Sequence, residues 1–142
     1  MELPDELYGK IEELSEQGNV FPDNMEFDQA IKKWLQALEL LPDPQVDWEA
    51  YTWLSASIGD AFFQSGNYKE ALDFLFDALN GPDGHGNPFI HFRLGQCQIK
   101  LGQENGIENL LKAYMLDGEE IFNEDNDGES YLQLLRDRGL VD

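Results

Sequence analysis

The sequence predicts an all-α protein built from repeated helix pairs, and two observations support this prediction. First, apolar residues recur three and four positions apart on both sides of Gly66-Asn67, as in two amphipathic helices joined by a tight turn. Second, the spacing of Ile58-Gly59 and Ser65-Gly66 returns 36 residues later at Leu94-Gly95 and Leu101-Gly102. A spacing kept over this distance indicates stacked helical repeats.

Turn and capping signals set the expected helix boundaries. Asn80-Gly81-Pro82 ends one helix, because glycine caps a helix end and proline cannot continue the helix. Asn87 before Pro88 gives a later helix a clean start, and Asp47 is expected to cap the start of the third helix. The predicted pairs are 5–17 with 28–41, 47–65 with 68–80, and 88–101 with 104–117, followed by a last helix near 129–138.

The repeated residues resemble the tetratricopeptide repeat, a helix pair of about 34 residues with small residues at fixed positions. Here the small residues are Gly59, Ala71, Ala78 and Gly95, which would let paired helices approach closely. The resemblance implies an all-α fold of three tetratricopeptide helix pairs in a short right-handed superhelix plus a C-terminal capping helix. It implies a single domain over 1–142: repeat 1 about 4–42 with an insertion at 20–26, repeat 2 about 47–83, repeat 3 about 87–119, and the capping helix about 129–138.

The charge of the chain restricts its partners. Twenty-nine acidic residues face nine basic ones, which gives a net charge of −20. Residues 1–30 hold nine carboxylates and only Lys10, and residues 117–129 hold seven carboxylates and no base. Such a surface repels nucleic acid and anionic lipid, and it attracts a basic protein. The alternative is that the acidic residues only keep the protein soluble.

The composition also bears on location. No apolar run approaches the roughly 20 residues that a membrane span needs. The first ten residues lack the basic and apolar segments of a signal peptide. The single cysteine, Cys97, excludes an internal disulfide and suits a reducing compartment. We expect a soluble, cytoplasmic protein.

Three candidate chemistries lack a complete motif. Segment 123–128 has oxygen-bearing side chains at positions 1, 3 and 5 of a calcium loop, but Leu134 stands at position 12, where the loop requires Glu. A solvated acidic turn is therefore expected there. His85, His91 and Cys97 have no paired metal-ligand spacing. No catalytic triad has a sequence signature, so we predict no metal, no cofactor and no enzyme, with a spatially assembled active site as the remote alternative.

The resemblance also implies a binding surface, because the first helix of each tetratricopeptide pair presents one face to a concave inner surface. Transferring the family's positions gives these partner-binding residues: Asp5, Tyr8, Glu12, Trp53, Ala56, Asp60, Phe63, Phe89, Phe92, Gln96 and Ile99. They would form an aromatic groove with an acidic rim, the pattern of interface hot spots. The alternative is that half of the aromatic residues pack under neighbouring helices.

A tetratricopeptide site that holds a peptide's terminal carboxylate with Lys, Arg and Asn is not expected here. The corresponding positions carry Ser57 and Asp60 in the second pair, and only Arg93 and Lys100 are basic in the third.

A further resemblance concerns function. The stretches 21–27, 48–54 and 87–90 look like small bacterial tetratricopeptide proteins encoded beside polymorphic toxins of the Rhs kind. This resemblance implies an immunity protein, or antitoxin, that binds and occludes a cognate basic toxin domain. The alternative within the same class is a secretion chaperone or scaffold.

Overall fold

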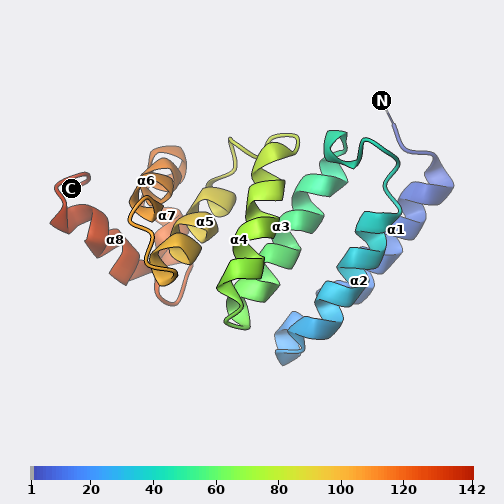
Figure 1. Cartoon of the computed structure of the whole chain (residues 1–142), viewed down its shortest axis with the longest axis horizontal. Coiled ribbons are helices and arrows are strands. Elements are labelled where there is room, and N and C mark those ends of the chain that lie inside the picture. The colour runs from blue at the N-terminus through green and yellow to red at the C-terminus, as the bar shows by residue number, and fades with distance from the viewer. Residues whose placement is uncertain (1) are drawn as a thin grey trace. The chain divides into compact units, whose positions relative to one another are not determined.

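The computed structural model describes residues 2–142 (Figure 1). These residues form eight α-helices and two 3₁₀ turns and contain no strand, which confirms the all-α prediction. None of these helices is long and apolar enough to cross a membrane. The chain divides into two compact units, one ending at Pro82 and one beginning at Asp83, and each is described by itself. The single domain and the superhelix expected from the sequence stay predictions.

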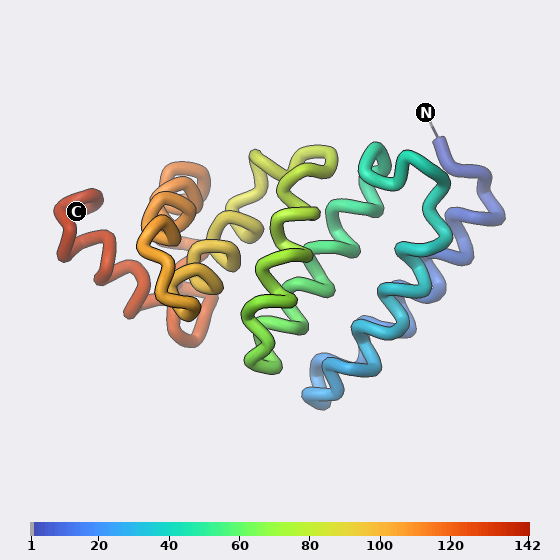
Figure 2. The backbone as a smooth tube through the Cα atoms, in the orientation of Figure 1, coloured from blue at the N-terminus to red at the C-terminus, as the bar shows by residue number. Residues whose placement is uncertain are grey.

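The first unit contains two helix pairs. Its elements are α1 (Asp5–Asn19), the 3₁₀ turn η1 (Pro22–Asn24), α2 (Phe27–Glu39), the 3₁₀ turn η2 (Gln45–Asp47), α3 (Glu49–Gln64) and α4 (Tyr68–Asn80). Helix α2 packs against α1 and α3, and α4 packs against α3. The tube in Figure 2 shows the connection between α2 and α3 passing beside the N-terminal residues of the chain.

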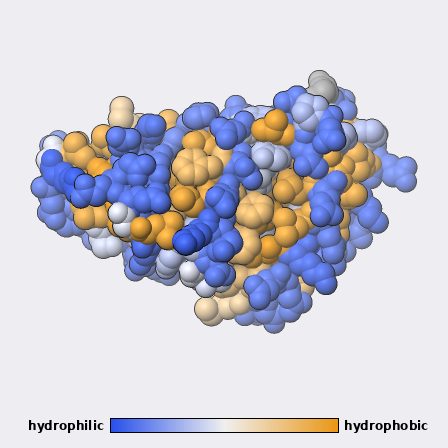
Figure 3. All heavy atoms as spheres, in the orientation of Figure 1, coloured by the Kyte–Doolittle hydropathy of each residue, from blue (hydrophilic) through white to orange (hydrophobic). Residues whose placement is uncertain are grey.

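The core of the first unit lies between these helices. Buried apolar side chains come from α1, α2 and α3, among them Ile11, Ala30 and Leu54. The indole nitrogen of Trp34 donates to the Ser15 carbonyl oxygen at 3.2 Å and to Asn19 Oδ1 at 3.1 Å, which ties α2 to α1. Partly buried apolar side chains also reach the surface, and Figure 3 shows apolar atoms between the hydrophilic atoms of α2 and α4.

The second unit contains α5 (Pro88–Lys100), α6 (Gly106–Asp117), α7 (Glu120–Asn123) and α8 (Gly128–Asp137). Asn87 begins α5 as predicted: its Oδ1 accepts from the amides of Phe89 at 2.9 Å and Ile90 at 3.4 Å. Side chains of α5, α6, α7 and α8 form one core, which includes Phe92 and Phe122.

The predicted boundaries hold to within about two residues for the seven expected helices, and two details differ. Asp47 does not cap α3, because it lies in the η2 turn and Trp48 precedes the helix without a capping side-chain bond. The short helix α7 was not predicted. Its acidic flanks obscured Ile121 and Phe122, which are both buried.

Glycines set the distance within the α3–α4 and α5–α6 pairs, as the sequence predicted for Gly59 and Gly95. A Cβ added to Gly59 would lie 2.7 Å from Cγ of Leu75 on α4. A Cβ added to Gly95 would lie 2.9 Å from the carbonyl oxygen of Gly106, at the start of α6. These distances are shorter than van der Waals contact, so only glycine permits the observed approach.

We expect Gly95→Ala to destabilise the protein by about 1–3 kcal/mol, because the Gly106 backbone cannot yield without separating α5 from α6. Gly9→Ala is the matched control, because Gly9 lies within α1 and a Cβ added there would have no neighbour within 4 Å. That change should stabilise the protein by up to about 1 kcal/mol through helix propensity. Thermal and urea unfolding measure both, and equal effects of the two substitutions would contradict the packing argument.

Candidate functional site

Three of the predicted binding residues meet at one end of the first unit. Asp5 and Tyr8 lie three positions apart on α1, and Trp53 lies on α3. They border an open hollow of about 710 Å³, called here the N-terminal hollow. Its lining is Glu2, Leu3, Asp5, Tyr8, Asp47, Trp48, Glu49, Ala50, Trp53 and Pro82.

The aromatic side chains of this hollow are accessible. Tyr8 is 51% exposed and Trp53 is 41% exposed. Trp48 is half-buried, and its indole nitrogen donates to the Pro42 carbonyl oxygen at 2.8 Å, which restrains the ring. Thr52 Oγ1 donates to the carbonyl oxygen of Pro82 at 2.8 Å and so holds Pro82 beside α3. Large exposed aromatic rings in a concave site are typical of binding surfaces.

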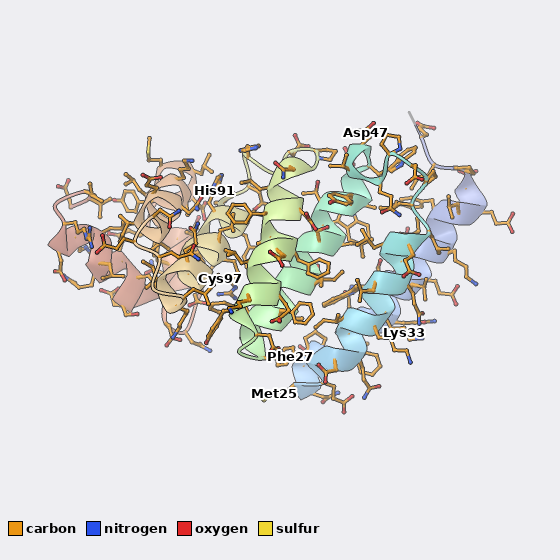
Figure 4. All side chains as sticks on the ribbon, viewed as in Figure 1. Met25, Phe27, Lys33, Asp47, His91 and Cys97 are labelled. Atoms are coloured by element: carbon orange, nitrogen blue, oxygen red, sulfur yellow. The ribbon has the colours of Figure 1, made fainter. Side chains whose placement is uncertain are left out.

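The N-terminal hollow is strongly acidic. Its lining includes the exposed residues Glu2, Asp5, Asp47 and Glu49, and it includes no Lys or Arg. Asp5 and Glu49 stand in the first turns of α1 and α3, where the helix dipole favours carboxylates. Asp47 lies before α3 (Figure 4) and Glu2 lies before α1, so both add negative charge beyond those first turns.

Seven of the lining residues were not predicted: Glu2, Leu3, Asp47, Trp48, Glu49, Ala50 and Pro82. The N-terminal segment brings Glu2 and Leu3 there, and the connection through η2 brings Asp47 and Trp48; neither segment has a counterpart in the repeat pattern. Glu49 could have been found, because it lies four positions before Trp53 and therefore shares its helical face.

The other predicted residues of the first unit differ in exposure. Glu12 is exposed on α1, and Ala56 is buried on α3. Asp60 and Phe63 are half-buried, and the Phe63 ring lies 5.4 Å from the Tyr68 ring. That these residues contact a partner stays a prediction. The α1–α3 surface is defined here as Asp5, Tyr8, Glu12, Trp53, Asp60 and Phe63, without the buried Ala56.

The prediction is wrong for two residues of the second unit. Phe92 is 1% exposed and Gln96 is fully buried, so neither can contact a partner in this structure. The Phe92 ring packs edge-on against Phe122 of α7, with centroids 5.0 Å apart. The unpredicted helix α7 therefore converts this part of α5 from surface into core. Phe89 and Ile99 remain half-buried.

A buried polar network also occupies this part of α5. Arg93 Nη1 donates to Asp125 Oδ1 at 2.8 Å and to Gln96 Oε1 at 2.7 Å, and Gln96 Nε2 donates to Asp125 Oδ2 at 3.1 Å. The sequence predicted a solvated acidic turn at 123–128, but the Asp125 carboxylate is engaged by Arg93 and Gln96. Asp125 thus pairs with Arg93, one of the basic residues that a site for a peptide's terminal carboxylate would use.

The ring of His91 has two structural partners. His91 is buried, with Nδ1 3.0 Å from Asn109 Oδ1 and Nε2 2.8 Å from the His85 carbonyl oxygen. Cys97 is buried further along α5 (Figure 4). Within residues 2–142, no group of three or more His, Cys, Asp or Glu side chains could hold a metal ion.

Two pKa values in the first unit are shifted upward. Partial burial raises the pKa of Asp77 on α4, and the negative charge of Asp73, one turn away, raises it further. Burial likewise raises the pKa of Tyr51 on α3, with a further contribution from Asp77. Like charges one turn apart on a helix repel each other, so α4 adds to the acidic character of the unit at some cost in stability.

Solved structures match nearly the whole chain. The first TPR domain of Spaghetti (RPAP3), bound to the HSP90 peptide SRMEEVD, is 16% identical with a TM-score of 0.70 and covers 94% of this chain and 98% of its own. The Arabidopsis OM64 TPR domain is 14% identical with a TM-score of 0.72, covering 93% and 98%. The C-terminal TPR-containing domain of a Plasmodium falciparum FK506-binding protein is 20% identical with a TM-score of 0.75, covering 96% and 93%.

The chain has the tetratricopeptide-repeat fold. No protein-family model matches it, and a search of curated proteins gives no match. This tetratricopeptide chain therefore shares its backbone architecture with the three domains, while its side chains differ at most positions. Its function has to be argued from its own surface.

We expect Asp77→Asn to raise the unfolding temperature at pH 7 and to leave it unchanged at pH 3. The pKa of Asp77 is raised in the folded state from its ordinary value of 3.8, so the folded state loses stability as pH rises through this range. At pH 3 the carboxyl group is protonated in both states and resembles the amide. A pH-independent effect in thermal melts would show that another contact is responsible.

Asp125→Ala should destabilise the second unit by about 3 kcal/mol, because it removes a carboxylate that pairs with the buried Arg93 guanidinium. Glu119→Ala is the matched control. It breaks an ion pair with Arg136 in which Glu119 is 50% exposed, so it should cost less than about 1 kcal/mol. Chemical unfolding followed by circular dichroism compares the two, and similar losses would contradict the role given to Asp125.

Proposed function

We propose that this protein binds a basic protein partner through the α1–α3 surface and has no catalytic activity or cofactor of its own. One observation carries the proposal: the N-terminal hollow combines accessible aromatic rings with four carboxylates and no basic residue. Aromatic anchors within a charged rim resemble the hot spots of protein interfaces. The net charge of −20 would draw a basic partner toward this surface.

The chemistry differs from that of the Spaghetti domain. The peptide in that complex, SRMEEVD, has three acidic residues and one basic residue. The α1–α3 surface has the opposite preference, and Arg93 of the second unit is paired with Asp125. A partner rich in Lys and Arg fits this chain better than an acidic peptide tail.

We further propose that the partner is a toxin domain and that the protein is a cytoplasmic, bacterial immunity protein. The resemblance of 21–27, 48–54 and 87–90 to proteins encoded beside Rhs-type toxins supports this role. A toxin domain that acts on nucleic acid or nucleotide needs a basic cleft, and an acidic surface with protruding aromatic rings is complementary to such a cleft. Inhibition would follow from occlusion of the cleft.

Co-expression tests this role directly. The toxin domain encoded beside this gene should stop growth when it is expressed alone, and this protein should restore growth. Normal growth of cells that express the neighbouring domain alone would favour the chaperone or scaffold alternative. Capture of an exported client protein instead of a toxin would favour it as well.

We expect association with that toxin domain to slow markedly as salt rises to physiological strength, where the screening length is about 8 Å. Asp60→Lys, on α3, should abolish or badly weaken binding, because it places a positive charge opposite the basic residues of the toxin domain. Glu108→Lys, exposed on α6, changes the net charge equally and should have only a small effect. Stopped-flow and equilibrium measurements give both quantities, and an on-rate that is independent of salt would assign the acidic residues to solubility alone.

A further inference from the structure

The N-terminal hollow has the composition of a receptor for a single organic cation. Two accessible rings, Tyr8 and Trp53, come from different helices. A third ring of the lining, Trp48, is restrained by the hydrogen bond that its indole nitrogen donates to the Pro42 carbonyl oxygen. Carboxylates stand in the same lining on α1, on α3 and in the segments that precede these helices. Aromatic faces attract cations, and carboxylates pair with them, so both features select the same ligand charge.

We propose that the N-terminal hollow binds an arginine side chain of the protein partner. This inference rests on the proposed function, because it names the group of the basic partner that the site recognises. A guanidinium is planar, so it can stack on an indole or phenol ring while its N–H groups donate to carboxylates at its edge. The hollow offers both kinds of surface within about 710 Å³, which is ample for one such side chain and its flanking backbone.

Other occupants fit less well. An acidic or phosphorylated peptide would face four carboxylates with no basic residue among the lining. An apolar segment would leave those carboxylates to be desolvated without a partner, which is costly. A lysine ammonium satisfies the charge, but it is compact and strongly hydrated and gains less from the rings. Arginine is therefore the side chain that can interact with both the aromatic rings and the carboxylates of this lining.

Short peptides provide the test. Acetyl-Gly-Arg-Gly-amide, its lysine analogue and its citrulline analogue would be titrated at physiological salt while the indole N–H signals of Trp34, Trp48 and Trp53 are followed by NMR. Citrulline keeps the shape of arginine and removes its charge. The arginine peptide should shift Trp53 saturably and more strongly than the lysine peptide, and the citrulline peptide should have little effect. Trp34 is buried in the core and serves as the internal reference.

Two variants separate a built site from general attraction to an acidic protein. Trp53→Leu keeps the net charge and an apolar side chain but removes the π face, so arginine-peptide affinity should fall about ten-fold, as followed by the Trp48 signal. Phe76→Leu is the matched control, because Phe76 is 39% exposed in the same unit and lies outside the hollow. It should bind like the unchanged protein. Circular dichroism and thermal melts establish that both variants are folded.

The outcomes distinguish this inference from the proposed function. If the arginine peptide leaves Trp53 unshifted, or if the citrulline peptide shifts it equally, the arginine site is refuted, whether or not the toxin is neutralised. If Trp53→Leu and Phe76→Leu bind alike, the attraction is general and the inference also fails. If the arginine peptide binds as expected but the toxin is not neutralised, the site stands and the immunity role does not.

Discussion

The close approach of the paired helices is the constraint on which the rest of the structure depends. Gly59 lies against Leu75, and Gly95 lies against the backbone of Gly106, at distances that no Cβ would allow. This contact fixes α3 on α4 and α5 on α6. Once the second helix of each pair covers one face of the first, the exposure of the remaining face decides what that first helix can bind.

In the first unit, that remaining face stays accessible at its N-terminal end. Leaving Trp53 and Tyr8 half exposed gives up part of the hydrophobic stabilisation that burial would provide. The carboxylates around them also repel one another. Under the proposed function, a cationic partner that covered the rings and neutralised the charge would reduce both costs.

In the second unit, the same repeat position has a different role. Phe122 of helix α7 covers Phe92 of α5. Asp125, in the loop that follows α7, pairs with Arg93 of α5. A short acidic segment thus supplies both an apolar cover and a counter-ion. The two units show that repeat position alone does not make a residue part of a binding surface.

The sequence by itself determined the helix pairs, their turns and the glycine contacts, because these depend on local periodicity and on residue size at fixed spacing. The resemblance to the tetratricopeptide repeat also indicated Asp5, Tyr8 and Trp53, which line the N-terminal hollow. The sequence could not indicate that Glu2 and Asp47 join them, or that Phe92 and Gln96 are buried. Those outcomes depend on where irregular segments pass over the helices, and only tertiary packing decides the path of a segment that has no periodicity of its own.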